Sequence, residues 1–352
     1  MKTAIILTGG LLHTSDAKTA HGLIRESNRY KIVGLVDHLN AGKDAGEVLD
    51  GKNRNLPIFA SVSEALQTNP SYCIVGVATT GGIFPESMLE DIKFAIKNKL
   101  SIVNGLHDYL SERPEITALA AQYGVELIDI RKPKTRKDLK FWTGKIRDLE
   151  TPVIAILGTD CSLGKRTTTR FMVSAFAENK VNAQMIYTGQ TGWLQGGKYG
   201  FIFDSTLNDF VGGELEDAIL RCAEDTKADV ILIEGQAALR NPSGPCGSEL
   251  LISGNAKHVV LVHAPKRLYY DNEEEWGEIP SLESEISLIN LYGSKVIAIA
   301  INTENCSEEE SLQFQQHYSE KFNIPILRPL QEGCGDLIPV IKQIINDNKV
   351  SY

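Results

Sequence analysis

The sequence has few cysteines, and none of them is spaced like a metal or redox motif. Six cysteines are scattered over 352 residues, and no two of them stand in a CxxC arrangement. A disulfide framework and a structural zinc site are therefore not indicated. Such a pattern suits a reducing compartment, so we expect a cytoplasmic protein.

The sequence also lacks a concentrated basic region and a long apolar run. Lys and Arg number 36 against 45 Asp and Glu, which gives a net charge of −9. Nucleic acid is excluded as the main partner, because phosphate neutralisation needs a basic face. The first apolar run, 3–8, is too short for a spanning helix and has no signal-peptide cleavage pattern, so we expect no membrane association.

What the sequence does contain is a regular alternation of apolar runs and helical stretches. The runs are rich in Val and Ile without strict alternation, as in parallel strands that are covered on both faces. The predicted strands are 3–8, 30–37, 72–78, 100–106, 125–131, 153–158, 182–189, 228–235, 258–264, 294–302 and 324–330. A basic, polar stretch with a proline near each end, 131–152, separates two groups of strands. We therefore predict two α/β domains, 1–133 and 153–352, joined by a linker at 134–152.

The stretch "VIAILGTDCSLGKRTTT" (153–169) predicts a phosphate-binding loop between a strand and a helix. Glycines let backbone N–H groups surround a diphosphate, the following helix presents its positive end, and a lysine adds a mobile charge. Five residues lie between the two glycines, one more than in the standard P-loop. The predicted phosphate-binding residues are Gly158, Thr159, Asp160, Cys161, Ser162, Leu163, Gly164, Lys165, Arg166 and Thr167.

Arg166 stands where a P-loop normally has the Ser or Thr that helps to hold Mg²⁺. Two interpretations stay open. Either Thr167 takes over the metal, or the loop holds a diphosphate without a tightly organised metal. Because coenzyme A also carries an adenosine diphosphate, the loop alone does not distinguish ATP from acetyl-CoA.

The motif "GTDCSLGK" resembles the modified P-loop of dethiobiotin synthetase and related enzymes. That resemblance implies an acidic metal ligand at Glu234, which ends a buried strand, and an adenine contact at Asn302. Asp204 and Asp209 fall where a further acidic ligand would lie. The metal set implied for Mg²⁺ is thus Thr167, Asp204, Asp209 and Glu234.

Longer stretches across almost the whole chain are similar to the DgcN-like family, which is associated with D-glutamate N-acetyltransferase. They include "GVATTGGIFPESMLEDI" (76–92), "NGLHDYLSERPEITALAAQYGVELIDIRKP" (104–133), "GTDCSLGKRTTT" (158–169) and "TGQTG" (188–192). The resemblance implies an N-terminal Rossmann-like domain and a C-terminal P-loop NTPase-like domain. It also implies acetyl-CoA as donor and an acidic amino acid as acceptor. Asn241-Pro242 departs from the histidine-proline expected there.

The first domain lacks a GxGxxG fingerprint, which argues against a nicotinamide cofactor. Lys18 and Thr19 open its first predicted helix and are predicted to bind the substrate. His107 follows a strand and is a predicted general base, because a neutral histidine can take a proton from an amine. His263, at another strand end, is the second candidate.

A further glycine turn at 188–192 follows a strand of the P-loop domain. Gln190 is predicted to act in catalysis, and Thr191 and Gly192 to bind the substrate, because oxyanions of acyl transfer need fixed donors. The sequence favours a small-molecule N-acyltransferase that forms a homo-oligomer. An ATP/Mg-dependent ligase or kinase and a nucleotide-switched sensor are the alternatives.

Overall fold

The computed structural model describes residues 1–350, without the side chains of residues 80, 349 and 350. The chain divides into two compact units. Unit 1 comprises Met1–Lys134 together with Gly189–Gly197, and unit 2 comprises Thr135–Thr188 and the chain from Lys198 onward. The predicted boundaries 1–133, 134–152 and 153–352 do not include the separate segment 189–197 and stay a prediction.

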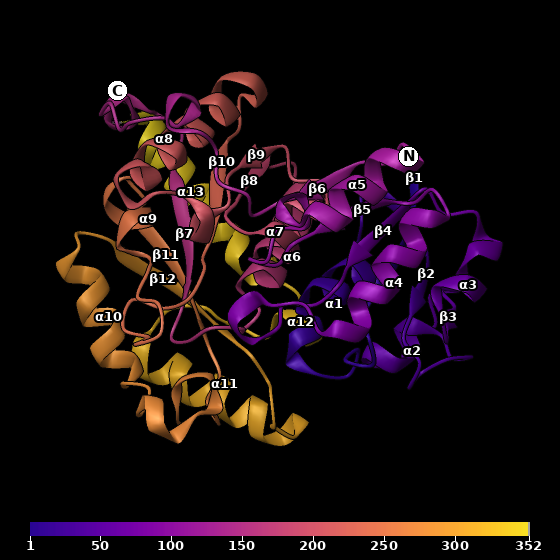
Figure 1. Ribbon diagram of the computed structural model, residues 1–352. Coiled ribbons are helices and arrows are strands. Elements are labelled where there is room, and N and C mark those ends of the chain that lie inside the picture. The colour runs from indigo at the N-terminus through magenta and orange to yellow at the C-terminus, as the bar shows by residue number, and fades with distance from the viewer. Residues whose placement is uncertain (351–352) are drawn as a thin grey trace. The chain divides into compact units, whose positions relative to one another are not determined.

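Unit 1 is built on a parallel sheet of six strands in the order β3-β2-β1-β4-β5-β6 (Figure 1). Its strands are β1 (Lys2–Leu7), β2 (Tyr30–Val36), β3 (Ile58–Phe59), β4 (Tyr72–Val75), β5 (Ser101–Asn104) and β6 (Leu127–Asp129). Its helices are α1 (Lys18–Arg25), α2 (Ala45–Asp50), α3 (Val62–Ala65), α4 (Glu86–Lys97), α5 (Pro114–Tyr123) and α7 (Gln190–Leu194).

Unit 2 is built on a parallel sheet of seven strands in the order β13-β12-β11-β7-β10-β8-β9. Its strands are β7 (Val153–Gly158), β8 (Ala183–Tyr187), β9 (Tyr199–Gly200), β10 (Val230–Glu234), β11 (His258–His263), β12 (Lys295–Ile301) and β13 (Ile326–Leu327). Its helices are α6 (Lys165–Glu178), α8 (Asn208–Thr226), α9 (Ser248–Ile252), α10 (Leu282–Leu291), α11 (Glu308–Phe322), α12 (Pro329–Glu332) and α13 (Ile338–Val350).

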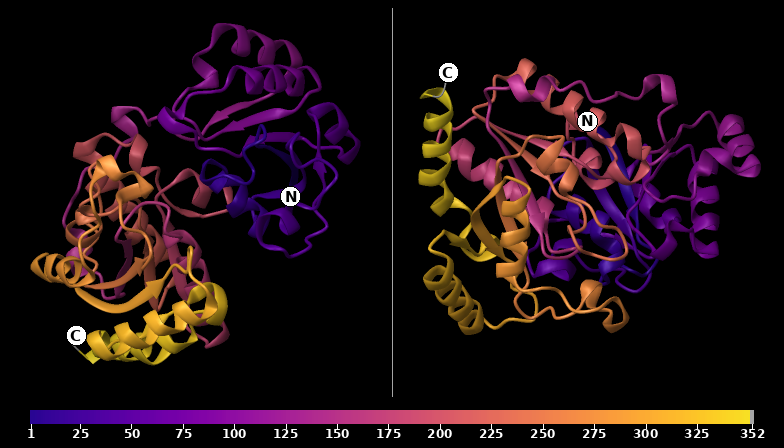
Figure 2. Two further views of the ribbon diagram at one scale, coloured as in Figure 1. Left: turned by 90° about the horizontal axis from the view of Figure 1, so that it is seen from below. Right: turned by 90° about the vertical axis from the view of Figure 1, so that its left-hand side faces the viewer.

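Helices cover both faces of the second sheet, which explains why its strands are continuously apolar. Ile154 and Ile156 of β7 pack in one buried cluster, whose helical side is α6 and α13. Ala155 and Leu157 point to the opposite cluster, whose helical side includes α8, α10 and α11. Figure 2 shows α13, in yellow, alongside the strands of this unit. The predicted parallel α/β architecture is confirmed.

Two buried carboxylates attach the chain before β7 to α8. Glu214 accepts from the Lys140 backbone N–H at 2.8 Å. Glu216 accepts from the backbone N–H groups of Thr143 at 2.6 Å and Ile146 at 3.1 Å. Both carboxylates are at most 3% exposed. The expected linker is therefore hydrogen-bonded to unit 2 in its second half, because buried acids need such donors.

The segment 189–197 leaves the second sheet after β8 and packs within unit 1. Leu194 is fully buried in the same apolar cluster as Leu23 and Val103. Gln195 donates from its side chain to the backbone oxygen of Gly22 at 2.8 Å. The segment is thus part of the core of unit 1, although the strand before it belongs to unit 2.

No helix among the described residues is long and apolar enough to cross a membrane.

Candidate functional site

The predicted phosphate-binding residues form one loop at the end of β7 and the first turn of α6. A Cβ at Gly158 would lie 3.1 Å from Nζ of Lys165 and 3.2 Å from the backbone oxygen of Asp160, so a side chain there would crowd the loop. Ser162 and Gly164 have φ of +52° and +87°. These left-handed residues let the loop curl back to the start of α6.

Lys165 lies inside this loop rather than in solvent. It is 5% exposed, and its Nζ donates to the backbone oxygen of Asp160 at 2.5 Å. Burial lowers the pKa of its amino group, while nearby thiol and carboxyl groups act in the opposite direction. A bound phosphate would be a stronger partner for this ammonium than the backbone oxygen of Asp160, because the phosphate carries a negative charge.

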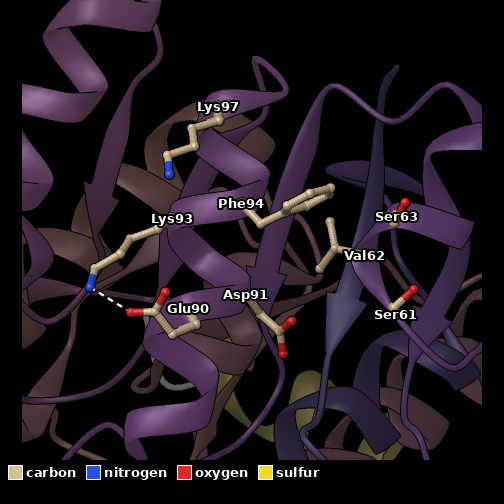
Figure 3. A pocket seen from close by; sticks show the side chains of 8 residues that line it. All are labelled: Ser61, Val62, Ser63, Glu90, Asp91, Lys93, Phe94 and Lys97. Carbon is tan, nitrogen blue, oxygen red and sulfur yellow. Dashed lines mark hydrogen bonds and ion pairs between the residues drawn. The ribbon is translucent and has the colours of Figure 1, made fainter.

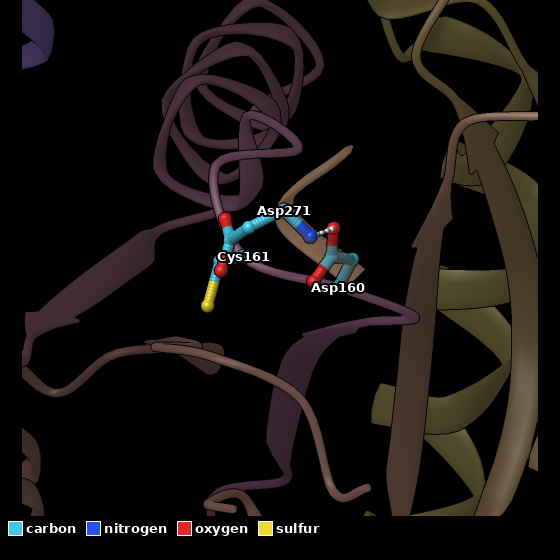
Figure 4. Close-up of side chains that lie close together, drawn as sticks. All are labelled: Asp160, Cys161 and Asp271. Atoms are coloured by element: carbon cyan, nitrogen blue, oxygen red, sulfur yellow. Dashed lines mark hydrogen bonds between the residues drawn. The ribbon is translucent and has the colours of Figure 1, made fainter. Parts of the chain in front are cut away.

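The side chain of Asp160 braces the loop and does not face a ligand. It is fully buried and accepts from Asn241 Nδ2 at 2.9 Å, Arg267 Nη1 at 2.9 Å and the Asp271 backbone N–H at 2.8 Å. Figure 4 shows Asp160 and Asp271 next to Cys161. A phosphate contact from Asp160 therefore has to come from its backbone, since its carboxylate would repel an anion.

The three side chains Asp160, Cys161 and Asp271 have ligand atoms within 4.8 Å of one another. A metal there would compete with Arg267, which pairs with the Asp160 carboxylate. Burial also raises the pKa of the Cys161 thiol to about 12, so the thiol stays protonated at neutral pH. The group is better explained as a hydrogen-bonded brace than as a metal centre.

Arg267 is a site residue that sequence reasoning missed. Besides Asp160, it donates to the backbone oxygen of Cys161 at 2.9 Å and pairs with Glu304 at 2.5 Å. Its side chain is 6% exposed. Asn241, noted as a departure from the expected histidine-proline, donates to the same carboxylate. Both residues come from loops that are remote in sequence from the P-loop. The one sequence signal for Arg267 is that it is a charged residue shortly after a buried strand.

Arg166 approaches the acidic residue at the end of β10. Its Nη1 lies 3.9 Å from Oε1 of Glu234, which is 4% exposed. Burial raises the pKa of the Glu234 carboxyl, and the charge of Arg166 opposes that change most strongly. The cation thus stands beside the carboxylate that would serve as a magnesium ligand in a standard P-loop enzyme.

The structure does not gather the remaining predicted metal ligands around Glu234. Asp204 and Asp209 are exposed, in a short helix at Phe203–Ser205 and in the first turn of α8. Within residues 1–350, the three acids form no group with ligand atoms inside 4.8 Å. Thr167, in the first turn of α6, is half-buried.

Asn302 and His263 both support the loop from neighbouring strand ends. Asn302 donates to the Leu163 backbone oxygen at 3.1 Å. His263 shares a hydrogen bond between its Nδ1 and Oγ1 of Thr159 at 3.0 Å. Burial lowers the pKa of His263 to about 4. The role of His263 as a general base stays a prediction, and so weak a base captures few protons at neutral pH.

The predicted substrate residues of unit 1 surround the start of α1. Oγ1 of Thr19 and Oγ1 of Thr191, 172 positions apart, share a hydrogen bond at 3.2 Å and are at most 3% exposed. These hydroxyls join α1 to α7, so they are not open to a substrate in this arrangement. Lys18 is exposed beside them, and Gly192 is buried.

Gln190 and His107 lie near the end of β5 in the same unit. A Cβ at Gly105 would come within 3.0 Å of Cγ of Gln190, which places this side chain directly against the strand end. Gln190 is 6% exposed, whereas His107 is exposed. Asp108 pairs with Arg113 at 2.6 Å, which lowers the pKa of its carboxyl. The Asp108 carboxylate is therefore held by Arg113.

Arg29 holds the α7 segment and was also missed. Its Nε donates to the Trp193 backbone oxygen at 2.7 Å and its Nη2 to the Gly197 backbone oxygen at 3.1 Å. Its guanidinium stacks 4.0 Å from the Trp193 ring centroid. Gln190, three positions before Trp193, is thereby fixed against β5.

A cavity of about 380 Å³ in unit 1 lies apart from these strand ends (Figure 3). Its lining comes from α3, the residue before it and α4, and includes Asp91 and Phe94. Two acids and two bases of α4 line it, and Lys93 pairs with Glu90 at 2.7 Å. It offers no group of converging charges.

Comparisons with known proteins agree with this arrangement. A family model described as a domain of unknown function (DUF1611), P-loop domain, matches residues 140–338. The corresponding N-terminal model, a Rossmann-like domain, matches residues 39–133. The chain belongs to this family. The predicted family resemblance and the predicted pair of domains are confirmed.

Two curated relatives in this comparison are named D-glutamate N-acetyltransferase. One, from Pseudoalteromonas sp, is 31% identical and aligns with 79% of this chain and 83% of its own. The other, from Tritonibacter scottomollicae, is 26% identical and aligns with 84% and 89%. A crystal structure of a DUF1611 family protein from Anabaena variabilis ATCC 29413 has a TM-score of 0.90 and 28% identity, covering 97% of this chain and all of that one.

Proposed function

We propose that this protein is an N-acyltransferase that moves an acetyl group from acetyl-CoA to the amino group of D-glutamate or a similar acidic amino acid. Relatives of that name at 26% and 31% identity support the reaction class. The P-loop offers a cradle for the donor's diphosphate, with the buried ammonium of Lys165 as its positive charge.

The contact between Arg166 and Glu234 carries the proposal. In a P-loop enzyme that transfers phosphoryl groups, the position of Arg166 holds a Ser or Thr whose hydroxyl binds the metal. The acid at the position of Glu234 helps to fix that metal. Here a cation lies 3.9 Å from that acid. A diphosphate carries less charge than a triphosphate, and a fixed guanidinium can offset part of it. The arrangement favours a thioester donor over a metal-bound triphosphate.

The transfer itself needs no metal. The amine nitrogen attacks the thioester carbonyl carbon, the C–N bond forms, the C–S bond breaks, and the amine proton leaves as the thiol is released. We assign His107 as the base that takes this proton and Gln190 as a donor to the oxyanion. Lys18 is the proposed partner of an acceptor carboxylate.

An assay that follows free thiol and ADP together tests the proposal. With acetyl-CoA and D-glutamate, thiol release should track N-acetylglutamate formation and should persist in EDTA. With ATP and D-glutamate, no ADP should form. ADP release in proportion to D-glutamate would replace this proposal by an ATP-dependent ligase or kinase, and tight nucleotide binding without turnover would replace it by a sensor.

The matched control is Thr167→Val, which removes the nearest alternative metal-binding hydroxyl and keeps the shape of the side chain. If Arg166 serves in place of a metal, acetyl transfer by this variant should stay as insensitive to EDTA as that of the parent. If Thr167 holds Mg²⁺, the parent should lose activity in EDTA and the variant should lose it without EDTA.

A further inference from the structure

A cavity of about 210 Å³ lies at the amino ends of the strands of the second sheet, whereas the P-loop follows the carboxyl end of β7. It lies where β7 and β11 begin, since Val153 and His258 both line it. Because parallel strands start at the same edge, this cavity lies at the other end of β7 from Gly158. It shares no lining residue with the loop and is separate from the site described above.

Basic side chains line this cavity, and acidic ones do not. Arg147, Lys257 and His258 contribute to the lining, together with the amides of Asn255 and Asn348. Lys295 is the register partner of His258 on β12, next to the cavity. Asp148 and Glu150 follow Arg147 in the sequence, but neither of them lines the cavity.

Some exposed cations of unit 2 pair with carboxylates, whereas among the described residues the cations at this cavity do not. Lys266 pairs with Glu310 at 2.5 Å and Arg221 with Asp217 at 2.8 Å. In the described part of the chain, no carboxylate lies within 4.0 Å of the charged nitrogens of Arg147, Lys257 or Lys295. Arg147 instead has its guanidinium 5.3 Å from the centroid of the Trp142 ring.

His258 adds a proton-dependent charge to this group. Burial, assisted by the charge of Lys295, lowers the pKa of its imidazole. A bound anion would offset the repulsion from Lys295, Lys257 and Arg147 and favour the protonated ring. Thr151 and the two asparagines also line the cavity and carry no charge.

We propose that this cavity is a binding site for a small dianion, namely a phosphate or a short dicarboxylate. The volume lies below the range of about 300–1,000 Å³ that is usual for drug-sized ligands, so a nucleotide is too large. Arg147 belongs to the segment that enters β7, whereas Lys257 and His258 belong to the start of β11. The anion would therefore join this segment to the sheet. The proposal is independent of the proposed function.

The experiment measures thermal stability and anion affinity at constant ionic strength, with inorganic phosphate, glutarate and acetate as probes. All proteins carry Lys165→Ala, so that the P-loop does not contribute to anion binding. A ligand that binds only the folded state raises the melting temperature. Phosphate or glutarate should raise it, and acetate should have less effect because it carries one charge.

The double variant Arg147→Gln, Lys257→Gln should lose at least about tenfold in affinity for the effective dianion, which is about 1.4 kcal/mol. The control Lys342→Gln removes an exposed lysine of α13 that does not line the cavity, and its affinity should match that of the parent. A response to phosphate alone or glutarate alone would identify the kind of ligand.

Equal affinities in the double variant and the control would overturn the proposal, as would equal responses to acetate and to both dianions. If the double variant were unfolded, the imidazole resonance of His258 in the otherwise unchanged chain would decide. It should shift on addition of the effective dianion, and an unchanged resonance under saturating phosphate and glutarate would contradict the site.

Discussion

The two units use polar side chains in different ways at the carboxyl ends of their strands. In unit 2, buried charges face one another: Asp160 is held by Arg267, and Glu234 lies beside Arg166. In unit 1, the fully buried carboxylate of Asp37, directly after β2, accepts instead from uncharged groups. Oγ1 of Thr8 donates to it at 2.7 Å and the Leu12 backbone N–H at 3.1 Å. The buried acids of unit 2 thus face cations, whereas the buried acid of unit 1 is held by uncharged donors, and Lys18 and His107 are exposed. In both units a buried acid therefore holds a strand-end loop in place, and in unit 2 cations balance its charge.

The largest expected effect is the loss of the Arg267 brace. Arg267→Met leaves the Asp160 carboxylate buried with only uncharged donors, which should cost about 3–5 kcal/mol of unfolding free energy. Lys266→Met, one position earlier, breaks only an exposed pair and should cost less than about 1 kcal/mol. Urea unfolding measures both. Equal losses in the two variants would mean that the buried pair does not stabilise the loop.

The next effect concerns ligand affinity rather than stability. Lys165→Ala should weaken binding of acetyl-CoA by about 100-fold, or about 2.7 kcal/mol, because the ammonium is buried within the loop. Lys342→Ala, on the exposed side of α13, should bind like the parent. Isothermal titration decides the matter, and an unchanged affinity in Lys165→Ala would make the loop purely structural.

A third effect is a dependence of stability on pH that arises at His263. Its folded-state pKa of about 4 lies below the ordinary 6.5, so the unfolded chain takes up the proton first as the pH falls. The stability that the neutral ring provides above pH 6.5 should be lost progressively down to pH 4, by about 3 kcal/mol. His263→Gln should show a correspondingly shallower loss between these pH values. Parallel acid-unfolding curves for parent and variant would rule out His263 as the cause.

The smallest effect is expected in unit 1, at the clamp on α7. Arg29→Lys keeps the charge but loses the two-pronged contact to Trp193 and Gly197, which should cost about 1–2 kcal/mol. Amide hydrogen exchange over 190–195 should quicken in this variant. The control is Arg25→Lys, because the guanidinium of Arg25 lies 3.9 Å from the carboxylate of Asp50. Exchange over 190–195 should not change in this control. Unchanged exchange in both would show that the apolar core alone holds the segment.

The sequence predicted the sheets well because their strands are buried on both faces. Long Val/Ile runs such as 153–158 leave no alternative to a covered parallel strand. The two-residue strands β3 and β9 were missed, since two residues carry no periodicity. β13 was predicted within 324–330 but spans only two residues there. The sequence also did not predict that 189–197 packs in unit 1. That packing depends on contacts of Leu194 with core residues that are far away in the sequence.

The loop itself was predictable, and its support was not. The spacing of Gly158, Gly164 and Lys165 is local and has a direct physical meaning. The partners of Asp160 are 81 and 107 positions away, at Asn241 and Arg267. Because the sequence alone does not show these partners, Asp160 cannot be distinguished there from an acid that binds a ligand. The predicted metal set stays a prediction. Asp204 and Asp209 were placed by analogy alone, and among the described residues they form no close group with Glu234.

The central claim is that Arg166, beside Glu234, allows the P-loop to hold a diphosphate without a metal. Its most direct test is the affinity of the parent protein for coenzyme A, measured by titration in Mg²⁺ and in EDTA. The account predicts dissociation constants that agree within about twofold, a difference of about 0.4 kcal/mol. An affinity that falls by about tenfold or more in EDTA, or that appears only for ATP with Mg²⁺, would contradict it.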